Sequence, residues 1–384
     1  MKSFRFLMPT EVVLARGCLD TLNERCRPLG EKPLLVTGKH SARASGSLER
    51  ALAQLPGAVL FDEVEENPTT LACERAAEQC KRHGCDFVVG LGGGSAMDAA
   101  KAIATLALNP GTCADYLGSD KIANPPLPIV AIPTTAGTGS EVTPYSVLVE
   151  PEARVKRTMR GVGLFPRLAL LDPELSLTMP RSVTASTGLD AFSQAMEGMV
   201  SRRATPFGDT LAIETCRIIK AWLPRAVDKP EDLDARSQML YAAMLSGCVI
   251  AQSGTTLVHG MGYYFTLESG LGHGLANAVL LTPLFQYNAQ HEPEKVAALA
   301  AALGHPCAPT PDDARKSIAT AIHALLHKVG VSPAAKDAGA NGERLQWYAG
   351  EIFADKGRAK NQPGQPALED IAQFYHAAYD GRID

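Results

Sequence analysis

Short apolar, β-branched runs alternate with helical stretches through the first half of the chain, and this alternation constrains the fold more than any other feature. The apolar runs cover residues 32–38, 58–64, 86–94, 127–135 and 167–172. The helical stretches between the first four runs cover residues 45–55, 69–84 and 95–108. Such an order is typical of βαβ units around a mainly parallel sheet. We therefore predict an α/β domain in the first half.

The second half has a different composition. From about Pro180 onward the β-branched runs disappear, and long alanine- and leucine-rich stretches such as 205–223 and 235–253 replace them. This change predicts an all-helical domain. Because domains longer than roughly 250 residues tend to split, we expect two domains in this chain of 384 residues, residues 1–178 and residues 179–384.

Composition argues against several kinds of partner. Charged residues make up 20% of the chain with both signs interspersed, and the net charge is -4, so we expect no nucleic acid and no membrane partner. The N-terminal stretch lacks the apolar core of a signal peptide, and no apolar run approaches the roughly 18 residues of a spanning helix. The nine cysteines are scattered without a C-x-x-C pair, which indicates neither a disulfide framework nor a zinc knuckle. We expect a cytoplasmic protein with reduced cysteines.

A glycine cluster follows the third predicted strand and opens a helix, in DFVVGLGGGSAMDAAKAIA. Gly92, Gly93 and Gly94 would let the backbone approach a pyrophosphate, to which the helix N-terminus would present free N–H groups. The spacing is not G-x-G-x-x-G, and the cluster does not follow the first strand, so the usual dinucleotide fingerprint is absent. One alternative stays open, because Ser95 and Asp98 could form a capping box on an ordinary helix.

A second loop with similar chemistry follows the next predicted strand, in IPTTAGTGSEVT. Six of the seven residues from Thr134 to Ser140 are hydroxyl-bearing residues or glycines, which suits a ribose or a phosphate. A mobile surface loop is the alternative. Two such loops at the ends of parallel strands indicate a nucleotide.

Several ordered motifs then point to a family. They are GGGSAMDAAKA, IPTTAGTGSEVT, LALLDPEL, TGLDAFSQAMEG, ATPFGDTLA, VHGMG and GHGLANAVLLTP. With these motifs the sequence resembles the iron-containing (group III) alcohol dehydrogenase family over roughly residues 5–290. The resemblance implies the dehydroquinate synthase-like fold, with an α/β domain that binds NAD(P) and an all-helical domain that holds one divalent metal, Fe²⁺ or Zn²⁺. It also implies an active site between the domains and hydride transfer between a nicotinamide and a small alcohol or aldehyde.

The same resemblance assigns residues to the coenzyme. By position, Gly92, Gly93, Gly94 and Ser95 would face the pyrophosphate with Asp98 close by, Thr134, Thr135, Thr138 and Asn67 would line the nucleotide, and Lys156 would lie near the ribose. From its arginine-rich neighbourhood alone, Lys156 is instead predicted to be a solvated surface cation.

The coenzyme preference is predicted from the residue after the first strand. Family members that prefer NAD usually carry an aspartate where this chain has Gly38, and that carboxylate would repel a 2′-phosphate. Gly38 removes the repulsion, and Lys39 and Arg43 are close enough in sequence to offer a cation. We predict that NADP is preferred over NAD or at least accepted.

The resemblance also implies a metal site. The family holds its metal with an aspartate and a histidine at i and i+4 of one helix, followed by two more histidines. Asp190, His259 and His273 match three of these ligands, whereas Gln194 stands in place of the i+4 histidine. Residues i and i+4 share a helix face, but glutamine offers only a neutral amide oxygen. We predict a site of Asp190, Gln194, His259 and His273, in which Gln194 is either a weak ligand or a hydrogen-bonding neighbour of the ligands.

Catalysis would then depend on the three matching ligands and on Tyr263. The metal would act as a Lewis acid on the substrate oxygen. Tyr263 lies one turn after His259, where many members have another histidine, and it could relay a proton or form an apolar wall. His323 and His327 also have i,i+4 spacing, but without the glutamate of H-E-x-x-H we expect them on a helix surface.

Other functions remain open from the sequence. A maleylacetate-reductase-like enzyme or a dehydroquinate-synthase-like lyase would share the fold, although a lyase would need a row of basic residues and the segment 252–270 is hydroxyl-rich without one. A coenzyme-binding protein whose metal centre has decayed through Gln194 is the third alternative. We expect a homodimer that acts on a small alcohol or aldehyde.

Overall fold

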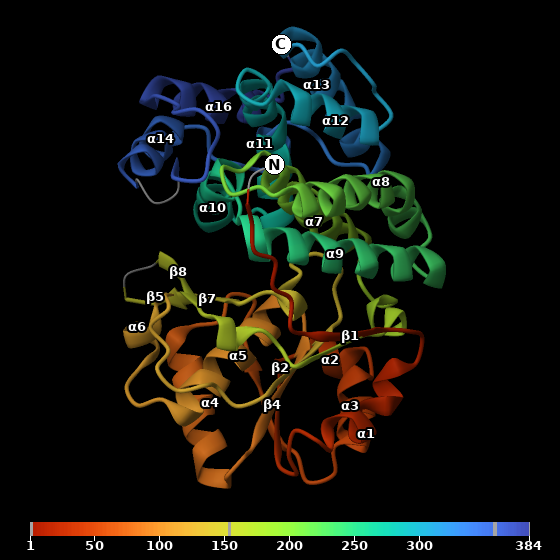
Figure 1. Cartoon of the computed structure of the whole chain (residues 1–384), viewed down its shortest axis with the longest axis vertical. Helices are drawn as coiled ribbons and strands as arrows, with labels where there is room; N and C mark the ends of the chain where they lie inside the picture. The colour runs from red at the N-terminus through yellow and green to blue at the C-terminus, as the bar shows by residue number, and fades with distance from the viewer. Residues whose placement is uncertain (1–2, 153–154, 356–358, 384) are drawn as a thin grey trace. The chain divides into compact units, whose positions relative to one another are not determined.

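The computed structural model describes residues 3–152, 155–355 and 359–383, and the chain divides into two compact units (Figure 1). One unit runs from Leu7 to Thr178, and the other begins at Met179. Residues 3–6 belong with the second unit, although the expected domain of residues 1–178 included them. The physical reason is an aromatic contact, since the ring of Phe6 lies 4.4 Å from that of Phe207, centroid to centroid.

The first unit is built on a six-stranded parallel sheet with the order β1-β9-β6-β4-β2-β3. Its strands are β1 (Glu11–Leu14), β2 (Pro33–Gly38), β3 (Val59–Val64), β4 (Phe87–Gly92), β6 (Ile129–Pro133) and β9 (Leu168–Leu171). The five predicted apolar runs contain β2, β3, β4, β6 and β9. The edge strand β1 was not predicted, because four residues are too few to show a period. Its pairing begins at Glu11 and Leu168.

Helices cover the sheet on both faces. They include α1 (Leu22–Cys26), α2 (Ser41–Ala44), α3 (Ser47–Gln54), α4 (Thr70–His83), α5 (Gly94–Leu108) and α6 (Cys113–Tyr116). Successive residues of β2 point to opposite faces: Leu34 and Val36 join the buried cluster of α4 and α5, whereas Leu35 joins the cluster of α1 and α3. The prediction of an α/β unit with a parallel sheet is confirmed.

A second, three-stranded sheet with the order β5-β8-β7 was not predicted. It consists of β5 (Gly118–Ser119), β7 (Tyr145–Glu150) and β8 (Val155–Arg160), with β7 and β8 antiparallel. Strand β8 is rich in polar and basic side chains, so it does not form an apolar run from which a strand could be predicted. The sheet is attached to α5, because Ser146 Oγ donates a hydrogen bond to the carbonyl oxygen of Asp98 at 2.7 Å.

The second unit is helical, as predicted. Its helices include α7 (Arg181–Val200), α8 (Pro206–Asp228), α9 (Leu233–Ser253), α10 (Leu257–Ser269), α11 (His273–Asn288), α12 (Pro293–Ala302), α13 (Pro311–Lys328), α14 (Leu345–Ala354) and α16 (Leu368–Asp380). Helix α7 packs against α8, α9 and α11, and every residue from Gly188 to Val200 is buried. Polar residues on this stretch of α7 are therefore placed in the interior.

Within the described ranges, no single helix is long and apolar enough to cross a membrane. Helices α9 and α10 meet the length and composition test only as a pair, and they are bent by 113° with respect to each other.

Candidate active site

Three side chains of the helical unit converge on one point. Asp190 comes from the buried centre of α7, His259 from the first turn of α10, and His273 is the first residue of α11. Oδ1 of Asp190 lies 3.3 Å from Nε2 of His259 and 3.7 Å from Nε2 of His273. One ligand atom from each residue fits within 4.8 Å of the other two. The structure therefore brings together three of the four predicted ligands with their donor atoms facing one another.

A second carboxylate orients His259. Glu197 is fully buried two turns after Asp190 on α7, and its Oε2 accepts a hydrogen bond from Nδ1 of His259. Its Oε1 accepts hydrogen bonds from the backbone N–H and the hydroxyl of Thr256, both at 2.8 Å. Because Nδ1 donates to Glu197, Nε2 is the ring nitrogen of His259 that faces Asp190 and is left to bind a metal. A carboxylate behind an imidazole is the usual way to fix a metal-binding histidine.

Asn277 holds the other side of the cluster. It is fully buried one turn after His273 on α11, and its Nδ2 donates to Oδ1 of Asp190 at 3.1 Å. The same Nδ2 lies 3.3 Å from Nε2 of His273. The close approach depends on Gly274, because a Cβ there would lie 1.8 Å from the carbonyl oxygen of Ser186 on α7. Any side chain at position 274 would push α11 and His273 away from Asp190.

Neither Glu197 nor Asn277 was predicted from the sequence. A signal existed for Glu197, since i and i+7 share a helix face and place it in line with Asp190. Asn277 lies at i+4 from His273, which gives the same kind of hint. Neither spacing identifies which histidine or carboxylate the side chain meets, because those contacts join different helices.

Gln194 lies beside the cluster as a bridge between two helices. Its Nε2 donates to Oδ2 of Asp190 at 3.1 Å, and its Oε1 accepts a hydrogen bond from Ser246 Oγ of α9 at 2.9 Å. The amide oxygen is the one atom through which a glutamine binds a metal ion, and here it accepts a hydrogen bond instead. Of the two predicted roles, this arrangement favours the hydrogen-bonding neighbour over the weak ligand.

The charges of the cluster suit a cation. Burial opposes protonation of His259, but Glu197 and Asp190 together raise the pKa of its imidazole to about 10. Burial also opposes ionisation of Asp190, yet His273 and His259 hold the pKa of that carboxyl below its ordinary value. Two buried carboxylates thus favour positive charge at this point.

The donor set also fits a divalent metal. Nε2 of His259 is buried without a well-aligned hydrogen bond to any described residue, and it faces Oδ1 of Asp190 at 3.3 Å. One carboxylate oxygen and two imidazole nitrogens form a suitable ligand set for Zn²⁺ or Fe²⁺. The residues that are present therefore fit the metal that the resemblance implies.

Tyr263 is buried on α10, one turn after His259. Its ring packs edge to face against Tyr264, with centroids 5.9 Å apart. Tyr264 in turn stacks on Tyr348, with centroids 5.4 Å apart. These contacts agree with the interpretation of Tyr263 as part of an apolar wall. A role of Tyr263 as a proton relay stays a prediction.

The glycine turn and the hydroxyl-rich loop of the α/β unit lie against each other. They follow the neighbouring parallel strands β4 and β6, in which Gly92 pairs with Pro133. The N–H of Thr134 donates to the carbonyl of Gly92 at 2.9 Å. A Cβ at Gly94 would lie 2.7 Å from the side chain of Thr138, so any larger residue here would displace Thr138 in the hydroxyl-rich loop. Parallel strands that end together at two such loops form the usual position of a nucleotide.

The capping-box interpretation of Ser95 and Asp98 is wrong. Helix α5 begins at Gly94 with Gly93 as its N-cap residue, so Ser95 already lies inside the helix. Its hydroxyl donates to the carbonyl of Glu66, which precedes the exposed Asn67 in the loop after β3. Ser95 therefore makes a hydrogen bond to a residue distant in the sequence in place of the predicted capping hydrogen bond within its own helix.

Asp98 also forms tertiary hydrogen bonds. Its Oδ1 accepts from Ser140 Oγ at 2.6 Å and its Oδ2 from the N–H of Val147 at 3.0 Å. Burial raises the pKa of this carboxyl, while Lys101 and, more weakly, Lys156 lower it. Asp98 thus ties the hydroxyl-rich loop and β7 to α5, and Lys156 on β8 contributes to the same local field.

The cations expected near the adenosine ribose already have acidic partners. Lys39 pairs with Glu65 at 3.1 Å, and Arg43 pairs with Asp62 at 3.0 Å. All four side chains are exposed, and exposed pairs contribute at most about 1 kcal/mol. A phosphate bound beside Gly38 could therefore compete for either cation.

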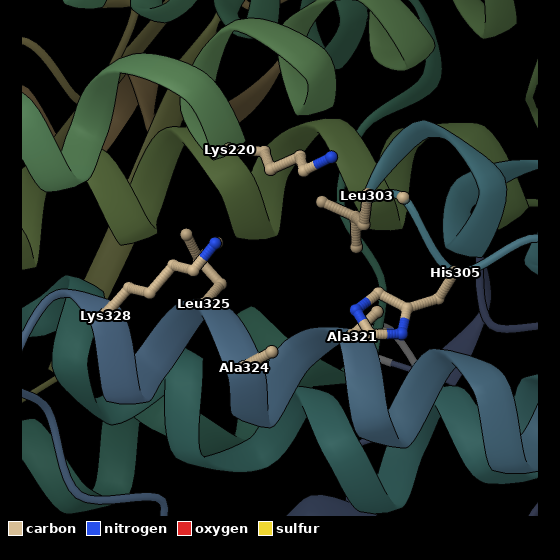
Figure 2. Close-up of a pocket in the computed structure, with 8 residues that line it drawn as sticks. Lys220, Leu303, His305, Ala321, Ala324, Leu325 and Lys328 are labelled. Atoms are coloured by element: carbon tan, nitrogen blue, oxygen red, sulfur yellow. The ribbon is translucent and has the colours of Figure 1, made fainter.

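His323 and His327 lie on α13 and belong to no cluster of metal-binding side chains in the described residues. A cavity of about 210 Å³ lies nearby, between α8, α13 and the segment after α12 (Figure 2). Lys220, His305 and Lys328 surround it (Figure 2). None of the predicted site residues lines this cavity.

Comparison with known proteins agrees with this geometry. The family model described as iron-containing alcohol dehydrogenase matches residues 9–173, and that of the Fe-containing alcohol dehydrogenase family, C-terminal, matches residues 184–379. The chain is 34% identical to 1,3-propanediol dehydrogenase of Klebsiella pneumoniae over 98% of this chain and 99% of the relative. It is 31% identical to NAD-dependent methanol dehydrogenase of Bacillus methanolicus over 96% of this chain and 98% of the relative.

A solved structure agrees as well. The crystal structure of 1,3-propanediol oxidoreductase superimposes with a TM-score of 0.93 at 33% identity, covering 98% of this chain and 100% of that one. The chain belongs to the iron-containing alcohol dehydrogenase family. It is an oxidoreductase of the alcohol dehydrogenase class, and the predictions of family and enzyme class are confirmed.

Proposed function

We propose that this chain catalyses hydride transfer between NAD(P)H and a small alcohol or aldehyde, assisted by one divalent metal ion. The observation that carries the proposal is the convergence of Asp190, His259 and His273, with Nε2 of His259 buried and without a hydrogen-bond partner among the described residues. A buried imidazole nitrogen in this position would destabilise the folded protein unless it bound a metal ion or a proton.

Each residue around the point of convergence has a distinct part. Asp190, His259 and His273 would hold the ion, which when bound supplies a Lewis acid for the substrate oxygen. Glu197 keeps the ring of His259 turned toward Asp190, and Asn277 keeps Oδ1 of Asp190 turned toward both histidines. Preorganised donor atoms of this kind lower the cost of binding an ion.

The coenzyme would occupy the two adjacent loops of the α/β unit. Gly92, Gly93 and Gly94 bring bare backbone to the N-terminus of α5, where a pyrophosphate would bind, and Thr134, Thr135 and Thr138 follow in the adjacent loop. We propose that both NAD(H) and NADP(H) bind. Gly38 carries no carboxylate that would exclude a 2′-phosphate, while the cations beside it are already paired with acids.

The substrate would be short. The two curated relatives named above act, by their names, on methanol and on 1,3-propanediol. We propose a primary alcohol of a few carbons, or the matching aldehyde. The protein's own residues supply positioning and charge, and the coenzyme supplies the hydride.

The decisive experiment pairs metal content with activity. Purified protein is dialysed against a chelator, its metal is measured by elemental analysis, and reduction of short aldehydes by NADH and NADPH is followed before and after Fe²⁺ or Zn²⁺ is added back. We expect activity to fall with metal content and to return on reconstitution. Full activity in metal-free protein, unchanged by added metal, would show that the metal-assisted function is wrong.

A further inference from the structure

Lys101 is a fully buried lysine at the centre of α5, in the unit that carries both nucleotide loops. Its side chain is 0% exposed. Its Nζ donates to three backbone carbonyls, those of Ser140 at 2.7 Å, Thr143 at 2.9 Å and Tyr145 at 2.8 Å. It also lies 2.8 Å from Ser140 Oγ, whereas the nearest carboxylate oxygen, on Asp98, is 3.8 Å away. Backbone carbonyls thus form most of the cage around this cation.

The cage closes an irregular stretch of chain. Residues Ser140–Val142 form a single 3-10 turn, and the chain becomes regular again only at β7, which begins at Tyr145. Buried carbonyls in such a stretch need more donors than the few N–H groups of the turn supply. Lys101 supplies them, and in return the carbonyls solvate an ammonium that would otherwise be strongly unfavourable in the interior.

The charge on Lys101 is retained near neutral pH. Burial lowers the pKa of its ammonium to about 8, while Asp98 and Glu141 act in the opposite direction. Asp98 lies one turn before Lys101 on α5, and its own bond to Ser140 Oγ ties down the same stretch. Two consecutive turns of α5 therefore hold the segment 140–145.

This attachment links the two loops proposed to bind the coenzyme. Helix α5 begins in the glycine turn, and the segment 140–145 directly follows the hydroxyl-rich loop. At the far end of the loop, the N–H of Thr134 donates to the carbonyl of Gly92 in the glycine turn at 2.9 Å. With one end fixed by that contact and the other by Lys101, the loop has a set position relative to the helix N-terminus.

We propose that Lys101 is a positioning residue for the coenzyme: its ammonium fixes the segment 140–145 and so sets the spacing between the glycine turn and the hydroxyl-rich loop. The proposal rests on the proposed function, because it concerns the same coenzyme site. Lys101 acts through the loop, since a fully buried side chain that already meets three carbonyls does not itself touch a bound dinucleotide.

Chemical rescue tests the cation directly. The change Lys101→Ala removes three methylenes and the ammonium, which together correspond to propylammonium, and it leaves the carbonyl cage in place. We expect Lys101→Ala to bind NADH and NADPH at least tenfold more weakly by calorimetry, and propylammonium to restore most of that loss. Tetramethylammonium at the same ionic strength is too bulky and has no N–H donors, so it should restore nothing.

Two further variants separate positioning from general stability. Lys101→Met keeps most of the volume but removes the charge, so it should lose coenzyme affinity and show no rescue. Thr105→Val changes a buried residue on the same helix, whose hydroxyl donates to the carbonyl of Lys101 at 2.9 Å. This control should keep coenzyme affinity within twofold of the wild type even if it lowers thermal stability.

Amide hydrogen exchange of residues 140–147 gives a readout that needs no coenzyme. We expect faster exchange there in Lys101→Ala and a return toward the wild-type rate with propylammonium. If Lys101→Ala does not fold alone, its refolding yield with and without the amine replaces this measurement. Wild-type coenzyme affinity in Lys101→Met, or no effect of propylammonium on exchange or refolding, overturns the proposal. If the wild type binds neither coenzyme, the proposed function fails, while exchange still tests the attachment itself.

Discussion

Glu197 and His259 are joined at two points, because the carboxylate of Glu197 accepts hydrogen bonds from both the backbone N–H of His259, at 3.3 Å, and its ring Nδ1. The contact is fully buried on the Glu197 side. It ties the first turn of α10 to α7 and fixes the direction of the imidazole at the same time. A carboxylate in this position determines which ring nitrogen is left to bind a metal.

Replacing Glu197 by glutamine should therefore weaken metal binding without removing a ligand. A glutamine keeps one of the two acceptor oxygens, but the other acceptor and the negative charge behind His259 are lost. We expect the affinity for Zn²⁺ to fall roughly 10- to 100-fold, measured by competition with a chelator of known affinity. Glu214→Gln, at an exposed position on α8, is the matched control and should change nothing. An unchanged affinity in Glu197→Gln would contradict the orienting role.

Replacing a ligand histidine should have a larger effect. His259→Ala and His273→Ala each leave two protein ligands, which rarely retain an ion, so we expect bound metal and aldehyde reduction to be lost together. Elemental analysis after dialysis and a coenzyme-oxidation assay follow the two quantities. His323→Ala removes a histidine that lies in no metal cluster of the described residues and should retain both. Activity that survives in either ligand variant without metal would argue against the proposed site.

Gln194 should respond differently to each of two substitutions. Gln194→Ala breaks the bridge between Asp190 and Ser246, and we expect metal affinity to fall roughly 10- to 100-fold while some metal remains. Gln194→His would supply a fourth ligand, the third imidazole of the site, and should tighten binding of Fe²⁺ or Zn²⁺. Ser246→Ala discriminates between the two roles of Gln194: it should weaken binding if the glutamine acts as a bridge. It should leave binding equal or tighter if the freed amide oxygen is itself a ligand.

Much of the fold was predictable because its periods are local. The centres of runs such as 32–38 and 127–135 are continuously apolar, at residues 33–36 and 127–133, as strands covered on both faces must be. The parallel sheet follows from the helices between the runs. The strand Glu11–Leu14 and the sheet that contains β8 escaped prediction for the opposite reason. Their pairing partners lie elsewhere in the chain, and their own residues show no clear pattern.

The site was predictable only as far as its residues share a helix. Asp190 and Gln194 could be placed together from their i,i+4 spacing, but the partners that orient the cluster come from other elements. Asn361 is an example of a contact that spacing cannot predict. Its Nδ2 donates to the carbonyls of Ser253 and Thr255, just before α10 begins. No spacing relates position 361 to the helix that carries His259.

The coenzyme preference can be tested at the end of β2. Gly38→Asp would place a carboxylate where a 2′-phosphate is proposed to bind, so kcat/KM for NADPH should fall by roughly tenfold or more, while that for NADH holds or rises. The position admits the change, because a Cβ at Gly38 meets only the carbonyl oxygen of Val64, at 3.4 Å. Steady-state kinetics with both coenzymes measure the ratio. A strong wild-type preference for NADH, or a ratio that Gly38→Asp does not move, would show that Gly38 does not set the preference.

Glu141 should make the stability of the protein depend on pH. This carboxyl is 2% exposed, and burial raises its pKa from 4.5 to about 7, with Lys101 only partly opposing the shift. Because the pKa is higher in the folded protein than in the unfolded chain, the protonated carboxyl contributes to folding stability. This contribution is fully present below pH 4.5 and is lost as the pH rises through 7. Glu141→Gln carries no charge at any pH. The free energy of unfolding of the variant, relative to the wild type, should therefore increase by roughly 1 to 3 kcal/mol between pH 5 and pH 8.

Urea unfolding at the two pH values measures this difference. Glu24→Gln, at an exposed position on α1, should give the same difference from the wild type at both. A Glu141→Gln effect that does not vary with pH would mean that the buried carboxyl ionises as easily in the folded protein as in the unfolded chain.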